Sequence, residues 1–452
     1  MHKPSEFNLR YILSLSVISA LGGLLFGYDI SVISGAIPFI TKFFGLNEWW
    51  KGFVVSSVYI GCMIGSMMAG KLGDKYGRKP LLLASALLFS ISAIGSGLAN
   101  SLEVFFIYRL IGGFGVGMAS LLSPLYIAEL APAKIRGQFV SINQFTIVIG
   151  ILLAYFVNYL LVGTGVNNWR WMFASEVVPS LFFLFGMMYV PESPRWLVKA
   201  HRQIEALQIL SRVGNINYAK KTLKNIEDSL SQRTMESLKI LLQKPLRPVL
   251  LIGITLAVFQ QWSGINVIFF YAPDIFAATG KGIETQLGQT VLIGMVNVTF
   301  TILAMFLVDK VGRKLLLLIG SLGMAGCYMA IGALFYFDNL KGIGFIIIIL
   351  LTIAFYASSL APVTWVIISE IFPNRIRGAM SIAVASQWIA NLIISWTFPI
   401  MNDNTWLTNI FHHGFAYWIY GLMGLLAALF VWKLVPETKG KSLEEMEKLW
   451  IK

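Results

Sequence analysis

A single carboxylate, Asp29, stands in the middle of the first long apolar stretch, which runs from about residue 11 to residue 40. Its immediate neighbours are Tyr28 and small residues, and the segment Leu21–Pro38 reads LGGLLFGYDISVISGAIP. A stretch of this length spans a bilayer at about 20 residues per crossing. A charge at that depth costs at least about 2.5–3.5 kcal/mol, so Asp29 must face a partner or water rather than lipid. Two roles are open: helix packing, satisfied by nearby backbone or hydroxyl groups, or a function in transport.

Arg109, in the sequence YRLIGG, is a second charge inside an apolar span. It lies about nine residues, or roughly 12 Å at helical rise, from the outer end of the fourth span. Asp29 lies about eleven residues, or roughly 16 Å, from the outer end of the first. Similar depth and opposite sign predict that Asp29 and Arg109 are partners.

The composition predicts that most of the chain lies in a membrane. Of the 452 residues, 57% are hydrophobic and only 13% are charged. Apolar stretches long enough to cross a bilayer recur about twelve times, over residues 11–40, 52–73, 80–99, 101–130, 137–162, 171–190, 247–279, 287–308, 315–336, 342–371, 378–402 and 413–435. The fold class is therefore an all-α membrane protein of twelve transmembrane helices. No cleavable signal peptide is evident, so the first stretch is expected to be a true crossing.

The net charge of +13 comes from Lys and Arg residues that cluster in alternate connections between spans. The positive-inside rule explains this pattern better than nucleic-acid binding does, and no nucleic-acid partner is predicted. The richer connections are then cytoplasmic, and an even number of crossings places both termini there. A multi-pass protein of the plasma (cell inner) membrane is predicted, with the lipid bilayer as its surroundings.

One long polar segment interrupts the spans, at residues 192–246. Apolar residues recur there at helical spacing among charged ones, which predicts short cytoplasmic amphipathic helices starting near Ser193-Pro194. Ser442–Leu449 (SLEEMEKL) predicts one more, with Ser442 as N-cap and Glu445 completing a capping box. The expected division is 1–191, an N-terminal six-helix bundle; 192–246, a linker; 247–436, a C-terminal six-helix bundle; and 437–452, a tail helix.

Three pairs of motifs recur in the same order in the two halves. GDKYGRK (Gly73–Lys79) returns as VDKVGRK (Val308–Lys314), and ELAPAKIRG (Glu129–Gly137) returns as EIFPNRIRG (Glu370–Gly378). PESPR, from Pro191, is answered by PETKG, from Pro436. The separations all lie between about 235 and 245 residues, so we infer a duplicated six-helix unit.

These motifs, together with PESPRW (Pro191–Trp196) and QQWSGIN (Gln260–Asn266), resemble those of the sugar porters of the major facilitator superfamily, especially the bacterial sugar–proton symporters. The resemblance covers nearly the whole chain and implies two pseudo-symmetric bundles around a central cavity, with alternating access. Transporters built from repeats place the substrate between their halves, near the middle of the membrane.

The resemblance implies that Asp29 and Arg109 form a proton-coupling pair, with Asp29 as the proton acceptor and Arg109 as its counter-ion. It also implies a monosaccharide site, in which amides match sugar hydroxyls and aromatic rings cover the C–H face. The expected substrate-binding residues are Gln144, Gln260, Gln261, Asn266, Asn297, Trp365, Gln387, Trp388, Asn391 and Phe26. Taken singly, each amide is better explained as a link between helices, whereas taken jointly the residues favour a binding site. Phe26 alone lies outside the positions that match the family's sugar-site pattern.

The repeated charges are expected to form a cytoplasmic gate. Arg binds carboxylates through two parallel hydrogen bonds, so opposite charges at helix ends can form a network when the halves close and break it when they part. The alternative is that the cations only fix topology, which leaves the repeated carboxylates unexplained. The expected members are Asp74, Arg78, Glu129, Arg136, Glu192, Asp309, Arg313, Glu370, Arg377 and Glu437.

The chain departs from the family pattern at two positions. Phe270 stands where related transporters carry a tyrosine, so it cannot donate a hydrogen bond, and sugar preference is expected to shift. Ala361, before Pro362, replaces a usual glycine and is expected to stiffen the tenth span.

The prediction is therefore import of a pentose or hexose coupled to protons, by a protein that functions as a monomer. A proton-independent facilitator and a membrane sugar sensor remain as alternatives. No enzyme activity, cofactor, catalytic group or metal site is predicted, because Cys62 and Cys327 lack ligand spacing and His412 and His413 fall in a loop.

Overall fold

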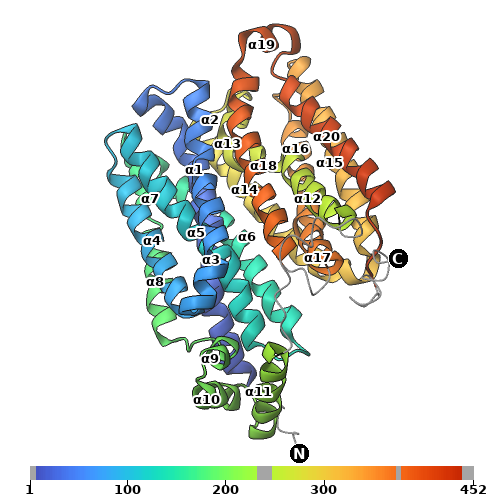
Figure 1. Ribbon diagram of the computed structural model, residues 1–452. Helices are drawn as coiled ribbons and strands as arrows, with labels where there is room; N and C mark the ends of the chain where they lie inside the picture. The colour runs from blue at the N-terminus through green and yellow to red at the C-terminus, as the bar shows by residue number, and fades with distance from the viewer. Residues whose placement is uncertain (1–6, 232–246, 373–377, 440–452) are drawn as a thin grey trace, which may run out of the picture. The chain divides into compact units, whose positions relative to one another are not determined.

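The computed structural model describes residues 7–231, 247–372 and 378–439, and within them the protein is helical (Figure 1). Among the described residues, twelve helical stretches are long and apolar enough to cross a membrane. The predicted fold class and the predicted number of spans are confirmed. The ends of the spans lie within four residues of the predicted ends, and some of the predicted apolar stretches are divided into two helices.

The first six spans lie between Leu9 and Tyr189. They are formed by α1 (Leu9–Phe44), α2 (Glu48–Ser56) with α3 (Val58–Tyr76), α4 (Arg78–Leu98), α5 (Leu102–Leu130), α6 (Arg136–Leu161), and α7 (Asn168–Ala174) with α8 (Val177–Tyr189). A 3-10 turn, η1 (Val162–Thr164), extends α6.

The second six spans lie between Arg247 and Leu434. They are formed by α12 (Arg247–Trp262) with α13 (Ile265–Ala277), α14 (Ile283–Val311), α15 (Arg313–Tyr336), α16 (Ile343–Phe355) with η3 (Tyr356–Leu360) and α17 (Ala361–Ile371), α18 (Gly378–Asp403) and α20 (Phe415–Leu434). A short helix, α19 (Thr405–Phe411), connects the last two.

Two spans of the second half are interrupted, one at a glycine and the other next to a proline. Gly264, between α12 and α13, has φ 84°, and a Cβ there would come within 2.6 Å of the Tyr420 ring. A residue without a side chain is therefore needed at this turn. In the other span, η3 is a π-helical turn that ends two residues before Pro362, which has no backbone N–H to continue the helical ladder.

The polar segment after α8 folds into the short helices that the sequence predicts: α9 (Pro194–Lys199), α10 (Gln203–Val213) and α11 (Ile216–Ser231). The first of them begins at Pro194, as expected, and Ser193 caps it, because the Ser193 hydroxyl accepts a hydrogen bond from the Trp196 N–H. Apolar residues of the three helices form a small core around Leu197 and Val198. The predicted tail helix over Ser442–Leu449 lies outside the described residues.

The described residues form two compact units. The first unit comprises Met1–Asp29, Gly61–Gly150 and Ala174–Met235; the second comprises Ile30–Ile60, Ile151–Phe173 and Glu236–Lys452, each as far as its residues are described. The second unit thus includes one end of α1, α2 and the last turns of α6. The predicted boundaries at residues 191, 246 and 436 follow chain order instead, and they stay a prediction.

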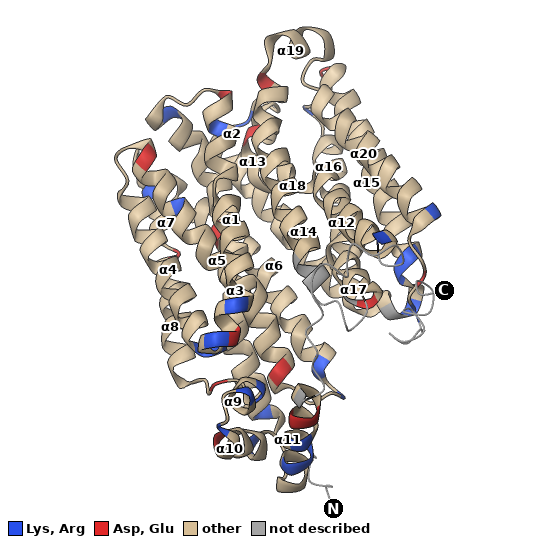
Figure 2. Cartoon of the chain, viewed as in Figure 1, with Lys and Arg blue, Asp and Glu red and all other residues tan. Residues whose placement is uncertain are grey.

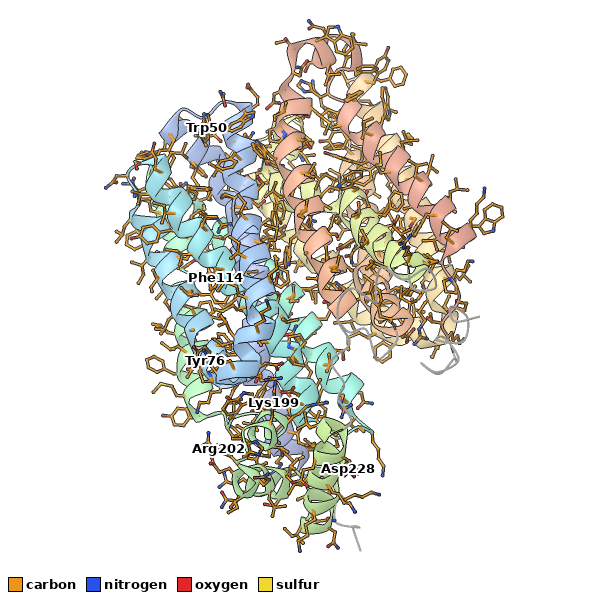
Figure 3. The ribbon with its side chains drawn as sticks, in the orientation of Figure 1. Trp50, Tyr76, Phe114, Lys199, Arg202 and Asp228 are labelled. Carbon is orange, nitrogen blue, oxygen red and sulfur yellow. The ribbon has the colours of Figure 1, made fainter. Side chains whose placement is uncertain are left out.

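In the first unit, Lys and Arg gather at the end that carries α9, α10 and α11, while the middle of the helices is almost free of charge (Figure 2). Figure 3 shows Lys199 and Tyr76 at that end, with Phe114 farther along the bundle. We call this the basic end of the first unit. It is the end at which the motif Gly73–Lys79 connects α3 to α4.

Candidate functional site

Asp29 and Arg109 form a buried ion pair within the first unit. The Arg109 Nη1 atom donates hydrogen bonds to Asp29 Oδ1 at 2.8 Å and to the Asp29 carbonyl oxygen at 3.3 Å. The two side chains are 1% and 0% exposed, so water screens neither charge. Gly112 makes room for them, because a Cβ there would lie 2.4 Å from the Ser92 hydroxyl and 3.4 Å from Asp29 Oδ1.

A second carboxyl group, that of Glu176, belongs to the same cluster. Glu176 lies between α7 and α8, is fully buried, and interacts electrostatically with both Asp29 and Arg109. Its carboxyl group lies within hydrogen-bonding reach of the Asp29 carboxyl group. Next to it, the Ser175 and Tyr28 hydroxyls are hydrogen-bonded at 2.6 Å. Two carboxyl groups therefore share one guanidinium in a site without access to solvent.

Four of the expected sugar-binding amides form one hydrogen-bonded cluster in the second unit. Gln260 Nε2 donates to the Leu360 carbonyl at 2.9 Å, while Gln260 Oε1 accepts from Gln387 Nε2 at 2.8 Å and from Gln261 Nε2 at 3.3 Å. Gln261 Oε1 in turn accepts from Asn266 Nδ2. All four side chains are buried. The cluster presents convergent donors and acceptors, which is what recognition of several hydroxyl groups requires.

Further expected residues of the second unit lie on α14, α17 and α18. Asn297 and Asn391 are buried, at 2% and 5% exposure. Trp388 stacks on Tyr59, with ring centroids 5.9 Å apart and planes inclined by 28°. Trp365 is partly buried on α17. The second unit therefore holds both polar side chains and aromatic faces of the expected site.

The two remaining expected residues belong to the first unit. Gln144 lies on α6 and Phe26 on α1, and both are partly buried. Phe26 lies three residues before Asp29, so α1 carries both one expected sugar-binding residue and the expected proton acceptor.

The repeated motif of the first unit builds a charge network at its basic end. Arg78 makes two parallel hydrogen bonds of 3.0 Å to the carboxylate of Glu129, and its Nη2 atom lies 3.2 Å from Asp74. Lys199, on α9, reaches Asp74 at 3.1 Å. Glu192 accepts from the backbone N–H groups of residues 78 and 79, at the start of α4. These contacts join α3, α4, α5 and α9.

The second unit repeats the arrangement. Arg313 Nη2 lies 3.3 Å from Glu370, and Glu437 accepts from the backbone N–H groups of Arg313 and Lys314 at 3.1 and 3.0 Å. Each half of the sequence thus uses the carboxylate of its PES or PET motif to satisfy the first N–H groups of a helix. Carboxylates are favoured at that position by the helix dipole.

The two capping carboxylates differ in their electrostatics. Burial raises the pKa of Glu192 above its ordinary value, although the N–H groups of Ser193, Arg78 and Lys79 act against the rise. Burial also opposes ionisation of Glu437, but its backbone N–H donors lower the pKa below the ordinary value. The deeper burial of Glu192 accounts for the difference.

Three expected members of the gate lie apart from these contacts. Arg136 begins α6 and is exposed. Asp309 lies on α14, but its side chain is outside the description, and Arg377 lies outside the described residues altogether. Contacts between the charges of the two halves, which define the expected gate, stay a prediction.

Comparisons with known proteins decide the family. Residues 15–450 match the family described as "Sugar (and other) transporter". This chain belongs to that family. It is 46% identical to a D-xylose-proton symporter of Escherichia coli K12 (99% of this chain, 97% of the relative) and 44% identical to an arabinose-proton symporter of Bacillus subtilis 168 (98% and 96%). A solved structure of the xylose transporter XylE from E. coli, in an inward open conformation, matches with a TM-score of 0.86 at 44% identity, over 97% of this chain and all of that one.

Membership in the sugar transporter family agrees with the duplicated motifs and with the prediction that the protein is a transporter rather than an enzyme. In the part of the chain that the structure describes, no group of three or more His, Cys, Asp or Glu side chains is arranged to hold a metal ion. The intramembrane charges and the amide cluster are therefore the candidate functional groups of this transporter.

Glu176 is the residue of this site that the sequence reasoning missed. The signal was available, because Glu176 is a lone carboxylate in the apolar run MFASEVVPSLFF. The rule that singled out Asp29 applies to it equally. Its proximity to Asp29 and Arg109 could not be read from the sequence, since these residues are 147 and 67 positions away.

Proposed function

We propose that the protein imports a monosaccharide together with protons, with Asp29 as the proton-carrying group. The observation that carries this proposal is the buried Asp29–Arg109 pair beside Glu176, in a member of a sugar transporter family. Desolvation makes a buried ion pair costly to form, and the loss of one partner leaves an unpaired buried charge. Such a pair therefore adds little to the free energy of folding. It is well suited to a site whose charge changes during a transport cycle.

Charge balance gives the proton a place in this site. With both carboxyl groups ionised, the cluster carries one excess negative charge against a single guanidinium, in surroundings that water does not reach. One proton shared between Asp29 and Glu176 removes that excess. When Asp29 binds a proton, its carboxyl group loses its charge and its interaction with Arg109 weakens. Release of the proton restores the ion pair.

In the second unit, the proposed sugar site consists of the amide cluster with Asn297, Asn391, Trp365 and Trp388. Gln144 and Phe26, in the first unit, are proposed as further substrate-binding residues. The amides form hydrogen bonds with one another in this structure, so sugar hydroxyls would exchange with existing bonds rather than fill unmet ones. Relatives named for D-xylose and arabinose support a pentose as the first substrate to test, with hexoses next.

We further propose that the protein functions as a monomer in the plasma (cell inner) membrane, with both termini and the basic end of the first unit in the cytoplasm. The distribution of Lys and Arg supports this orientation. In this proposal Arg78–Glu129 and Arg313–Glu370 belong to the cytoplasmic gate, which opens and closes access to the sugar site during alternating access.

The test uses purified protein in liposomes. With an inside-alkaline pH gradient, the wild-type protein should concentrate a labelled pentose. Asp29→Asn keeps the size of the side chain and removes its charge, so it should abolish concentration while still exchanging internal for external sugar. Asp338→Asn, at an exposed position just after α15, serves as the charge-removal control and should still concentrate sugar. If Asp29→Asn concentrates sugar like the wild type, Asp29 is not the coupling group.

A further inference from the structure

Helix α13 contains a carbonyl group that its own helix cannot satisfy. Pro273 has no backbone N–H, so the carbonyl of Phe269, four residues earlier, lacks its helical donor. The backbone departs from helical geometry between these two residues, with φ −111° and ψ 17° at Tyr271. Both Phe269 and Pro273 are buried, and a buried carbonyl without a donor is unfavourable by about 1–3 kcal/mol.

The missing donor comes from α6. The Tyr155 hydroxyl donates a hydrogen bond of 2.7 Å to the Phe269 carbonyl oxygen. Tyr155 is 1% exposed, and the bond itself is buried. Tyr155 and Phe269 both belong to the second unit, although they come from different halves of the sequence.

Phe270, the next residue, has no hydroxyl group, and its ring lies near that of Tyr59, with centroids 6.0 Å apart. The polar contact that α13 makes with Tyr155 is to its main chain, at the carbonyl freed by Pro273.

Neighbouring contacts of the same unit act at the same end of α13. Lys51 of α2 forms an ion pair of 2.7 Å with Asp274. Trp396 of α18 donates from its indole N–H to the carbonyl of Trp49 at 3.2 Å, and the two rings lie 5.0 Å apart. Segments of the N-terminal half thus hold α13 and α18 together at the end that the proposed orientation places outside.

We propose that Tyr155 is a positioning residue of the transport cycle, whose hydroxyl substitutes for the N–H that Pro273 lacks and so holds the outer ends of α6 and α13 together. The inference rests on the proposed function. When these ends separate to admit sugar from outside, the bond breaks and water reaches the Phe269 carbonyl. The bond therefore favours the closed outer face and sets how often it opens.

The experiment is a double-mutant cycle of Tyr155→Phe and Pro273→Ala. Tyr155→Phe removes only the hydroxyl, while Pro273→Ala supplies an N–H to the Phe269 carbonyl. Hydrogen–deuterium exchange of peptides from Ile265–Ala277, measured without sugar, reports the local opening of α13. Tyr155→Phe should accelerate exchange there about tenfold, which corresponds to the loss of one buried hydrogen bond. In the Pro273→Ala background the same substitution should change exchange less than twofold.

Uptake kinetics provide the functional readout. A more frequently open outer face should lower both the KM for external sugar and the maximal rate in Tyr155→Phe, and Pro273→Ala should largely restore both. Tyr159→Phe, one turn along α6, is the matched control and should change neither exchange nor kinetics. Equal effects of Tyr155→Phe with and without Pro273 would overturn the inference, as would unaltered exchange in Tyr155→Phe alone. Because the exchange measurement needs no sugar, its outcome is independent of whether symport is established.

Discussion

The turn between α3 and α4 makes a sharp prediction about Gly77. Its backbone angles, φ 102° and ψ 170°, lie in a region that only glycine occupies readily. A Cβ at this position would lie 2.2 Å from the Glu192 Oε2 atom. Gly77→Ala must therefore strain the backbone and displace the carboxylate that caps α4.

The magnitude follows from these two effects. A residue with a side chain in this region costs about 1–3 kcal/mol. Glu192 accepts backbone hydrogen bonds of 3.0 Å from Arg78 and 3.2 Å from Lys79, and losing one bond to a charged group costs about 1.5–3 kcal/mol. Gly77→Ala is therefore expected to destabilise the first unit by about 2.5–6 kcal/mol.

The assay measures the thermal unfolding temperatures of purified variants in detergent and ranks the variants by them. Gly312→Ala is the counterpart in the second half: φ is 101°, but the Cβ would lie 2.9 Å from Glu437 Oε2, so the loss should be smaller. Gly137→Ala is the control, since no atom lies within 4 Å of its Cβ and its φ is not positive. It should leave stability unchanged or slightly raised. If Gly77→Ala unfolds at the same temperature as Gly137→Ala, the proposed role of the glycine is wrong.

Three further predictions concern charges and amides. Glu129→Gln should lower the unfolding temperature clearly because it breaks a buried two-bond pair with arginine, whereas Asp74→Asn, which removes more exposed pairs, should cost less than about 1 kcal/mol. The pKa of Glu437 is lowered in the folded state, so its stabilising effect is present above the ordinary value of 4.5 and is lost as pH falls below it. The pKa of Glu192 is raised, so the stabilising effect of this group is present below the ordinary value of 4.5 and is lost as pH rises above it. Melting temperatures of Glu437→Gln and Glu192→Gln, each measured relative to the wild type from pH 3.5 to 7, should therefore change with pH in opposite directions. Gln261→Leu removes the acceptor of the buried Asn266 amide and one of the two donors to Gln260 Oε1, so it should raise the KM for sugar at least about tenfold; an unchanged KM would exclude the amide cluster from the sugar site.

The sequence by itself determined the number and order of the spans, because hydropathy and the cost of placing charge in lipid are local properties of the chain. It also determined the duplication, the charged motifs and the presence of short helices in the linker. Depth along a helix was sufficient to pair Asp29 with Arg109, since helical rise converts residue number directly into distance.

The tertiary structure alone decided which buried groups meet. Glu176 joins the ion pair, the amides bond to one another, and Tyr155 reaches the carbonyl that Pro273 leaves free. Each of these contacts depends on the rotation and packing of helices that are distant in the sequence, and hydropathy does not specify either one. The proline at position 273 implies that the carbonyl of Phe269 lacks its helical donor, but only the packing of α6 against α13 determined which side chain supplies the hydrogen bond.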